Sequence, residues 1–213
     1  MRHSPNVIEI IRTDTSTVES AIAHLIEALK SSGVTWNYLD GTKRIKSAYK
    51  GLHSINTLTA ISESKLKRPG QVHNIELVKL VAPLAFGRKT QVFDLSPRHF
   101  QYADNRSAAY RLPFFFSEDG VVKAFGLQFR KNGRLSNEQI AGYASIVKRF
   151  LLETEFYDMP ADIEFIDCGV PAGSEDRVAT KYSLIDLDLW TDEKIQSHME
   201  VVVEALRFIE DNE

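Results

Sequence analysis

The sequence contains a single cysteine and no long apolar run, and each shortage excludes a class of protein. Its one cysteine, Cys168, cannot form a disulfide within the chain, so we expect a reducing compartment. No stretch comes near the roughly 18 uncharged apolar residues that a membrane-spanning helix needs. The apolar segment Val7–Ile11 is too short for a signal peptide. These shortages predict a cytoplasmic protein that does not enter a membrane.

Motifs of the common enzyme classes are also missing. The chain has no G-x-S-x-G, H-E-x-x-H, C-x-x-C or G-x-G-x-x-G pattern. The segment Gly169–Ser174 has part of the glycine spacing of a phosphate loop, but the Gly-Lys-Ser or Gly-Lys-Thr ending is absent. The sequence therefore indicates no particular cofactor or metal and leaves both open.

The chain does contain the composition of an ordinary globular protein. Hydrophobic residues make up 43% of its 213 residues and charged residues 26%, which argues against disorder as the main state. A chain of this length favours one large domain, or a core with a small helical subdomain.

Charge is distributed unevenly along the chain, although the net charge is only −3. Residues 41–90 carry ten Lys or Arg and two Glu, a net charge of +8, and residues 91–150 have a net charge of +4. Residues 151–213 carry four basic and seventeen acidic groups, a net charge of −13, and residues 1–40 have −2. Such a gradient indicates either a polyanionic partner for the basic part or attraction between the basic and acidic parts.

Apolar periodicity, capping residues and turn residues predict both helices and strands. The pattern predicts helices over residues 17–31, 43–62, 72–86, 137–154 and 192–210. It predicts strands over residues 34–39, 90–95, 109–117, 121–130, 163–168 and 182–189, and a short strand or helix lead-in over 7–11.

The clearest local signal is Asp119-Gly120, which lies between two apolar runs. Glycine tolerates a positive φ, so this pair predicts a tight β-hairpin. We therefore expect an α+β fold with an antiparallel or mixed central sheet and helices packed on it. Residues 1–70 would form an N-terminal helical layer or cap, and residues 71–213 an α+β core, joined in one continuous domain.

From Val72 onward the predicted order is helix, three strands, helix and strand, up to about Cys168. This αβββαβ order resembles the core of the PD-(D/E)xK nucleases. In that family, an acidic residue and an E-x-K triplet on adjacent strands hold a divalent metal, and the lysine polarises the attacking water.

The resemblance implies a set of candidate catalytic residues. The triplet falls on Gln128-Phe129-Arg130, the strand carboxylate on Asp94 and an additional helix carboxylate on Glu76. Gln128 gives no negative charge to a hard cation, and Arg130 cannot release its proton as a tuned lysine does. The candidates Glu76, Asp94, Gln128 and Arg130 therefore predict a nuclease-like but catalytically degenerate core.

Basic residues supply a second reason to expect a nucleic-acid partner, because Lys and Arg release counterions from phosphates. The alternative is that they form an ordinary solvated helix face. The candidate contact residues are Lys43, Arg44, Lys46, Lys50, Lys65, Lys67, Arg68, Arg88 and Lys89.

Two functional hypotheses remain open from the sequence. The first is a nucleic-acid-interacting protein with a nuclease-like core that has lost catalysis. The second is a non-catalytic protein-interaction or self-assembling module, whose acidic residues 151–213 meet a basic protein or the basic helix of a second copy.

Overall fold

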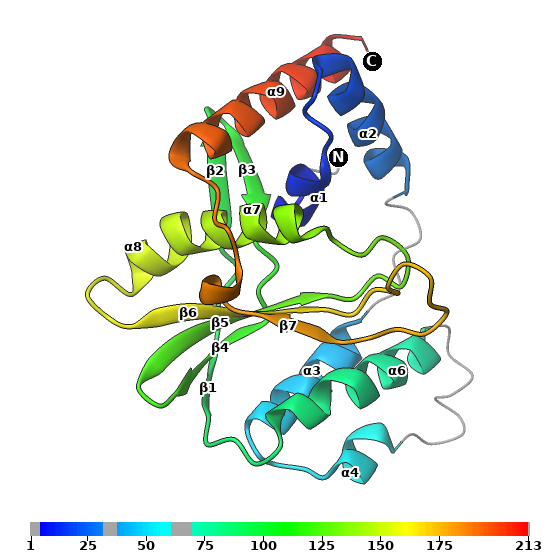
Figure 1. The fold of residues 1–213 in the computed structure, drawn as a ribbon, viewed down its shortest axis with the longest axis vertical. Helices are drawn as coiled ribbons and strands as arrows, with labels where there is room; N and C mark the ends of the chain where they lie inside the picture. The colour runs from blue at the N-terminus through cyan, green and yellow to red at the C-terminus, as the bar shows by residue number, and fades with distance from the viewer. Residues whose placement is uncertain (1–4, 32–37, 61–69, 213) are drawn as a thin grey trace.

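The computed structural model describes residues 5–31, 38–60 and 70–212. Its centre is a five-stranded mixed sheet with the strand order β1-β4-β5-β6-β7, and helices cover both faces (Figure 1). The strands are β1 (Gln91–Asp94), β4 (Phe114–Glu118), β5 (Val121–Gln128), β6 (Ala161–Asp167) and β7 (Thr180–Tyr182).

The αβββαβ core follows the predicted order. Strands β1, β4 and β5 pair antiparallel, and the β4–β5 turn falls on Asp119 and Gly120, whose φ angles are +51° and +81°. Helix α7 (Asn137–Val147) then leads the chain back to the same end, so that β6 runs parallel to β5. The α+β class and the mixed sheet are thus confirmed.

One face of the sheet is covered by helices α3 (Leu39–Tyr49), α4 (Ile55–Thr59) and α6 (Gln71–Val81), with the short turn η2 (Ala82–Ala85). The buried aromatic rings of this layer come from β4, β5 and the end of α3. Phe114 and Phe125 stack with their centroids 4.4 Å apart, and Tyr49 packs against both rings.

The single helix predicted over residues 43–62 is wrong. Helix α3 begins earlier, at Leu39, and ends at Tyr49, and α4 starts only at Ile55. Gly51 lies between them with a φ of +68°, the left-handed conformation that commonly stops a helix.

The opposite face is covered by α7 and by a further layer of helices, which are α1 (Val7–Arg12), α2 (Val18–Ser31) and α9 (Asp192–Asp211). Figure 1 shows α2 beside α9, at the far side of α7 from the sheet. The N-terminal helices thus contribute to both faces, α1 and α2 to one and α3 and α4 to the other.

Residues 7–11 form a helix, so of the two alternatives expected for this segment, a strand or a helix lead-in, the strand is wrong. Asn6 and Glu9 make a reciprocal capping box, in which each side chain accepts a hydrogen bond from the other's backbone. This cap supplies partners for the free N–H groups of a first helical turn, and it overrides the β-branched content of the segment. The strand expected over residues 34–39 lies mostly outside the described residues, and Leu39 already belongs to α3.

A separate hairpin, β2 (His99–Ala103) and β3 (Arg106–Ala109), was not predicted. It turns at Asn105, whose φ is +59°, and it makes its own two-stranded sheet. The strand expected over residues 109–117 is therefore shorter, because Arg111 has a φ of +56° and Pro113 precedes β4.

Two other segments differ from the prediction, which are the helix expected over residues 137–154 and the strand expected over residues 182–189. After α7 the chain continues as a π-helical turn, η3 (Lys148–Leu152), and a short α8 (Glu153–Glu155). The strand expected over residues 182–189 consists of the end of β7 and a 3-10 turn, η4 (Leu184–Asp186). No helix among the described residues has the length and apolar character needed to cross a lipid bilayer.

The close packing of α7 against Trp190 gives the first prediction. A Cβ atom at Gly142 would lie 2.7 Å from Cζ2 of Trp190, so Gly142→Ala should lower the free energy of unfolding by about 1–3 kcal/mol. Helix propensity alone predicts a gain of about 1 kcal/mol. Denaturant unfolding of both proteins measures whether Gly142→Ala lowers or raises the free energy of unfolding.

The control is the same substitution in a Trp190→Ala background, where the obstructing ring is absent. There, Gly142→Ala should be neutral or stabilising. If Gly142→Ala stabilises the unmodified protein, the described contact is wrong.

Candidate functional site

The candidate catalytic residues lie on different faces of the sheet. Asp94 pairs with Phe114, which pairs with Phe125, so these three share the face under α3 and α6. Gln128 follows Phe125 by three positions, and alternate residues of a strand point to opposite faces. Gln128 therefore faces the α7 side, and Asp94 cannot share a metal with it.

Each of these residues also has another partner. Asp94 is 90% exposed and forms an ion pair with Lys46. Glu76 is half-exposed on α6, where its carboxylate is 3.3 Å from Nδ1 of His73. Gln128 is buried and donates to the backbone oxygen of Gly133 at 3.1 Å.

These residues do not fit a divalent metal. In the part of the chain that the structure describes, no three His, Cys, Asp or Glu side chains lie close enough together to hold one. The sheet face between β4, β5 and α6 is filled by the stacked rings of Phe114 and Phe125 instead. A catalytic role for Glu76, Asp94, Gln128 and Arg130 stays a prediction that their placement does not support.

The basic residues predicted to bind nucleic acid divide into three groups. Lys43, Lys50 and Lys89 are exposed. Arg44 is held by Asp40, Lys46 by Asp94, and Arg88 by two glutamates. The predicted contacts at Lys65, Lys67 and Arg68 fall outside the described residues.

Arg88 has a structural role inside the molecule. Its Nη2 atom is 2.6 Å from Glu118 on β4 and 2.8 Å from Glu164 on β6. The guanidinium also lies 5.2 Å from the ring centroid of Phe116 and 5.3 Å from that of Tyr49. Arg88 thus joins two strands to the end of α3 and cannot serve as a free phosphate contact.

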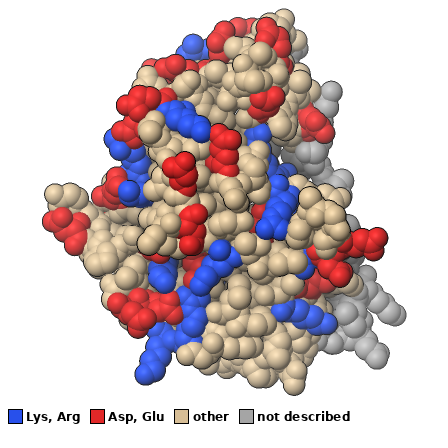
Figure 2. Space-filling model, in the orientation of Figure 1, with Lys and Arg blue, Asp and Glu red and all other residues tan. Residues whose placement is uncertain are grey.

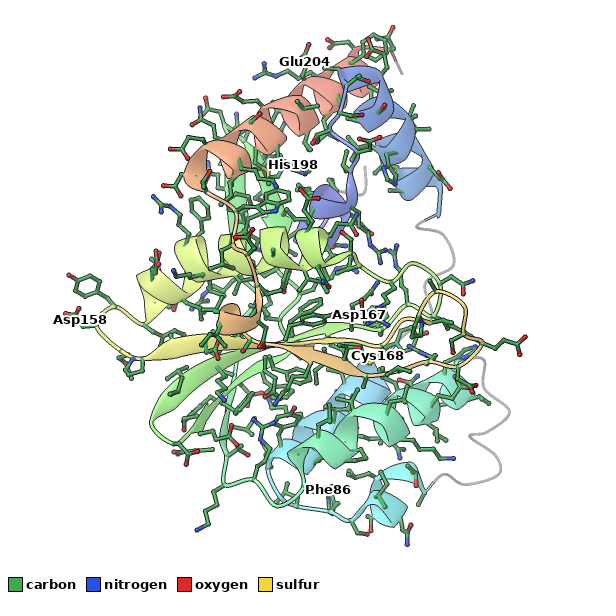
Figure 3. The ribbon with its side chains drawn as sticks, in the orientation of Figure 1. Phe86, Asp158, Asp167, Cys168, His198 and Glu204 are labelled. Carbon is green, nitrogen blue, oxygen red and sulfur yellow. The ribbon has the colours of Figure 1, made fainter. Side chains whose placement is uncertain are left out.

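A different polar cluster forms where the parallel strands β5 and β6 end. Gln128 and Asp167 are neighbours in the register of these strands, and both are buried. The Asp167 carboxylate accepts from the backbone N–H groups of Leu135 at 2.9 Å and Gly169 at 2.8 Å. Figure 3 labels Asp167 and Cys168 at this end of β6. Asp167 therefore fixes the loops that follow both strands.

Basic side chains from several segments surround this point. Arg12 of α1 donates to the backbone oxygen of Gly133, and Arg130 pairs with the buried Glu9 at 3.0 Å. Burial and the nearby charge of Arg130 lower the pKa of Arg12. The backbone oxygen of Lys131 accepts from the N–H of Val170, which joins the two loops. We call this cluster the carboxyl-end site, and it comprises Arg12, Arg111, Gln128, Arg130, Lys131, Arg134, Asp167 and Arg177.

Two members of the carboxyl-end site, the buried Arg177 and the half-buried Arg134, hold the loops. Arg177 is 6% exposed and donates to the backbone oxygens of Cys168 and Phe129, which joins the ends of both strands. Arg134 donates to Oγ1 of Thr180 at 3.0 Å. These hydrogen bonds fix the positions of the loops that follow β5 and β6.

Arg111 and Lys131 are the free charges of the carboxyl-end site. Both are exposed, and neither makes an ion pair with the described residues. Arg111 lines a small pocket with Glu9, Gln128 and Arg130, and its positive φ is unusual for a side chain of this size. Strained backbone of this kind is concentrated at functional positions.

The wider surface carries both signs of charge. On the face drawn in Figure 2, basic and acidic side chains are interspersed and do not form a large patch of one charge. The +8 charge of residues 41–90 therefore does not translate into one uniform basic face on the side of the molecule shown there.

Part of the carboxyl-end site is visible in the sequence, and part is not. Three of the five residues in Arg130-Lys131-Asn132-Gly133-Arg134 are basic, and this run lies just before the predicted start of α7. Arg12 and Arg111 join it only through the tertiary fold, so no local pattern could have identified them.

Comparison of the chain with models of protein families, with curated proteins and with solved structures gives no match. Function is therefore inferred from the placement and chemistry of the residues described above.

The Arg88 cluster gives a prediction of pH dependence. Hydrogen bonds from Arg88, and then from Lys123, lower the pKa of Glu118 from its ordinary 4.5 to about 2. A lowered pKa stabilises the fold above the unfolded-state value, and the contribution is lost as pH falls through the folded-state value. Glu118→Gln should therefore lower the free energy of unfolding most above about pH 5. The difference from the unmodified protein should shrink as the pH falls toward 2.

Denaturant unfolding of both proteins across this pH range measures the effect. Glu175→Gln, at an exposed position without an ion pair to the described residues, is the control and should have a small effect throughout. If Glu118→Gln lowers the free energy of unfolding by the same amount at every pH, the ion pairs described for Glu118 are wrong.

Proposed function

We propose that this chain binds nucleic acid through the carboxyl-end site, on a nuclease-like core that does not hold a catalytic metal. The observation that carries the proposal is the convergence of basic side chains where the parallel strands β5 and β6 end. Two of these side chains have acidic partners, since Arg130 pairs with Glu9 and the buried Arg177 lies 3.9 Å from Glu76 of α6. Loops after the carboxyl ends of parallel strands are frequent ligand sites in α/β sheets. Arginine presents a planar donor fork that matches phosphate oxygens.

The local charge balance supports an anionic ligand. The carboxylate of Asp167 is enclosed and held by two backbone N–H groups, and that of Glu9 is held by Arg130 and by the backbone of Asn6. The outward charges of Arg111 and Lys131 are left uncompensated by described residues. A phosphate group would therefore meet positive charge at this surface.

The shape of the site favours a chain of phosphates over a small molecule. The pocket beside Arg111 is small, and the basic side chains come from α1, the segment before β4 and the loops after β5 and β6. A shallow surface of this kind contacts successive phosphates, as in sequence-independent binding of single strands or duplexes.

Binding without cleavage is the form of the proposal that agrees with the residues present. The candidate carboxylates Glu76 and Asp94 are exposed, and Gln128 uses its amide to hold the Gly133 loop. None of these arrangements provides a metal-bound water. The second candidate function, protein interaction, is favoured by a groove beside α9.

A charge-removal experiment tests the proposal. Fluorescence anisotropy with a labelled oligonucleotide, single-stranded or duplex, should show binding that weakens steeply with salt. Arg111→Asn/Lys131→Gln should weaken binding by about tenfold and make the salt slope shallower by about two. Asparagine is chosen at position 111 because it tolerates a positive φ.

The matched control is Lys43→Gln/Lys50→Gln, which removes two exposed charges from α3. We expect this variant to change the affinity by less than about threefold and to retain the salt slope. Absence of binding at low salt would contradict the proposal, and so would a larger loss from the α3 variant.

A further inference from the structure

A groove of about 890 Å³ lies between β2, α9 and the π-helical turn η3. Figure 1 shows α9 passing above the β2–β3 hairpin, with α7 and its continuation below. The apolar residues that line the groove are Phe100, Tyr102, Phe150, Ile195, Met199 and Val203. Phe150 is 43% exposed there, although it packs on Phe100 at 4.8 Å between ring centroids.

Strand β2 presents an open backbone edge at His99 and Gln101, before the bulge that lies between Gln101 and Ala103. The N–H of Tyr110 donates to the oxygen of Arg98, so residues 98 and 110 form a hydrogen-bonded pair at the base of the hairpin. Hydrogen-bonded and non-hydrogen-bonded pairs alternate along an antiparallel ladder. Gln101, which is opposite Ser107, is therefore in a non-hydrogen-bonded pair, and its N–H and C=O point away from β3.

An open strand edge inside an apolar groove selects a specific kind of ligand. Unpaired N–H and C=O groups in a row are complementary to another extended backbone. A peptide that adds as a strand gains main-chain hydrogen bonds, and its alternate side chains enter the adjacent pocket. The apolar lining requires those side chains to be apolar.

The charged side chains of α9 that line the groove indicate which charge a ligand should carry. Glu200 and Glu204 are exposed in the groove wall, and neither forms an ion pair with a described basic residue. Figure 3 labels Glu204 on α9. Arg149 is already paired with Asp192, which leaves Arg207 as the single unpaired cation of the described lining. The wall is acidic on balance, as is the segment 151–213.

The groove geometry disfavours a second copy of the chain as the occupant. The edge of β2 forms one wall of the groove, between α9 on one side and η3 on the other. A second β2 edge would bring its own α9 and η3 into the same space. A single extended segment fits this recess without that conflict.

We infer that the β2–α9 groove binds an extended peptide segment of another protein, which adds as a strand to β2. Its alternate apolar side chains fill the recess between Phe100, Phe150 and Met199. Its intervening Lys or Arg side chains pair with Glu200 and Glu204. This inference is independent of the carboxyl-end site, because the two surfaces share no lining residue.

The test uses a fluorescein-labelled peptide of about nine residues in which Val and Lys alternate, flanked by Thr. Fluorescence anisotropy with the full chain should give a dissociation constant in the range of about 10–100 μM. Gln101→Pro removes the outward N–H without removing a hydrogen bond to β3, and it should weaken binding by about tenfold or more. Ser107→Pro is the matched control, because it removes the outward N–H of the opposite hairpin edge, and it should change the affinity by less than about twofold.

Two further arms keep the result interpretable if a proline variant fails to fold. A peptide N-methylated on every residue should not bind to the unmodified protein, because it has no N–H group to donate from either edge. Glu200→Lys/Glu204→Lys should reverse the preference, so that a peptide with Glu in place of Lys becomes the tighter ligand.

The inference is overturned by any of three results. These are no binding up to about 1 mM peptide, equal losses from Gln101→Pro and Ser107→Pro in folded proteins, or unchanged binding of the N-methylated peptide. A dimer in light scattering that Gln101→Pro abolishes would assign the groove to a second copy and would also overturn it.

Discussion

The parallel pairing of β5 with β6 is the constraint on which the rest of this structure depends. It requires a crossover, which α7 provides, and it brings the ends of two strands to one edge of the sheet. At that edge, Asp167 accepts from the backbone of Leu135 and Gly169, so one enclosed carboxylate orders the loops after both strands. The positions of Arg130, Arg134 and Arg177 follow from those loops.

The basic character of the proposed binding surface is therefore created by tertiary structure. The most basic part of the sequence, residues 41–90, loses several of its charges to internal partners: Arg88 joins β4 to β6, and Lys46 pairs with Asp94. The carboxyl-end site draws on Arg12 and Arg111, which are about a hundred residues apart in the chain. A charge count along the sequence cannot distinguish an internally paired residue such as Arg88 from an exposed one such as Lys131, which forms no ion pair with the described residues.

Local signals in the sequence were sufficient for the core elements. The Asp119-Gly120 turn and the Ser136 capping box each fix a short-range geometry, and both occur where they were expected. The αβββαβ order and the α+β class follow from them. The β2–β3 hairpin was missed because its strands are short and only Phe100 and Tyr102 give it an apolar face.

The errors have a common physical origin in competition between local preference and capping or packing. Residues 7–11 favour a strand by side-chain type, yet the Asn6–Glu9 cap makes them helical. The catalytic candidates failed to converge for a related reason. A spacing pattern indicates which residues lie on neighbouring strands, but the face of each strand depends on register, and register placed Asp94 and Gln128 on opposite sides.

The central claim is that phosphates contact the loops at the ends of β5 and β6, and photo-crosslinking tests it most directly. An oligonucleotide that carries 4-thiothymidine would be irradiated with the protein, and the crosslinked peptides would be identified by mass spectrometry. The account predicts crosslinks within residues 129–136 and beside Arg111. Crosslinks confined to α3, around Lys43 and Lys50, would contradict it.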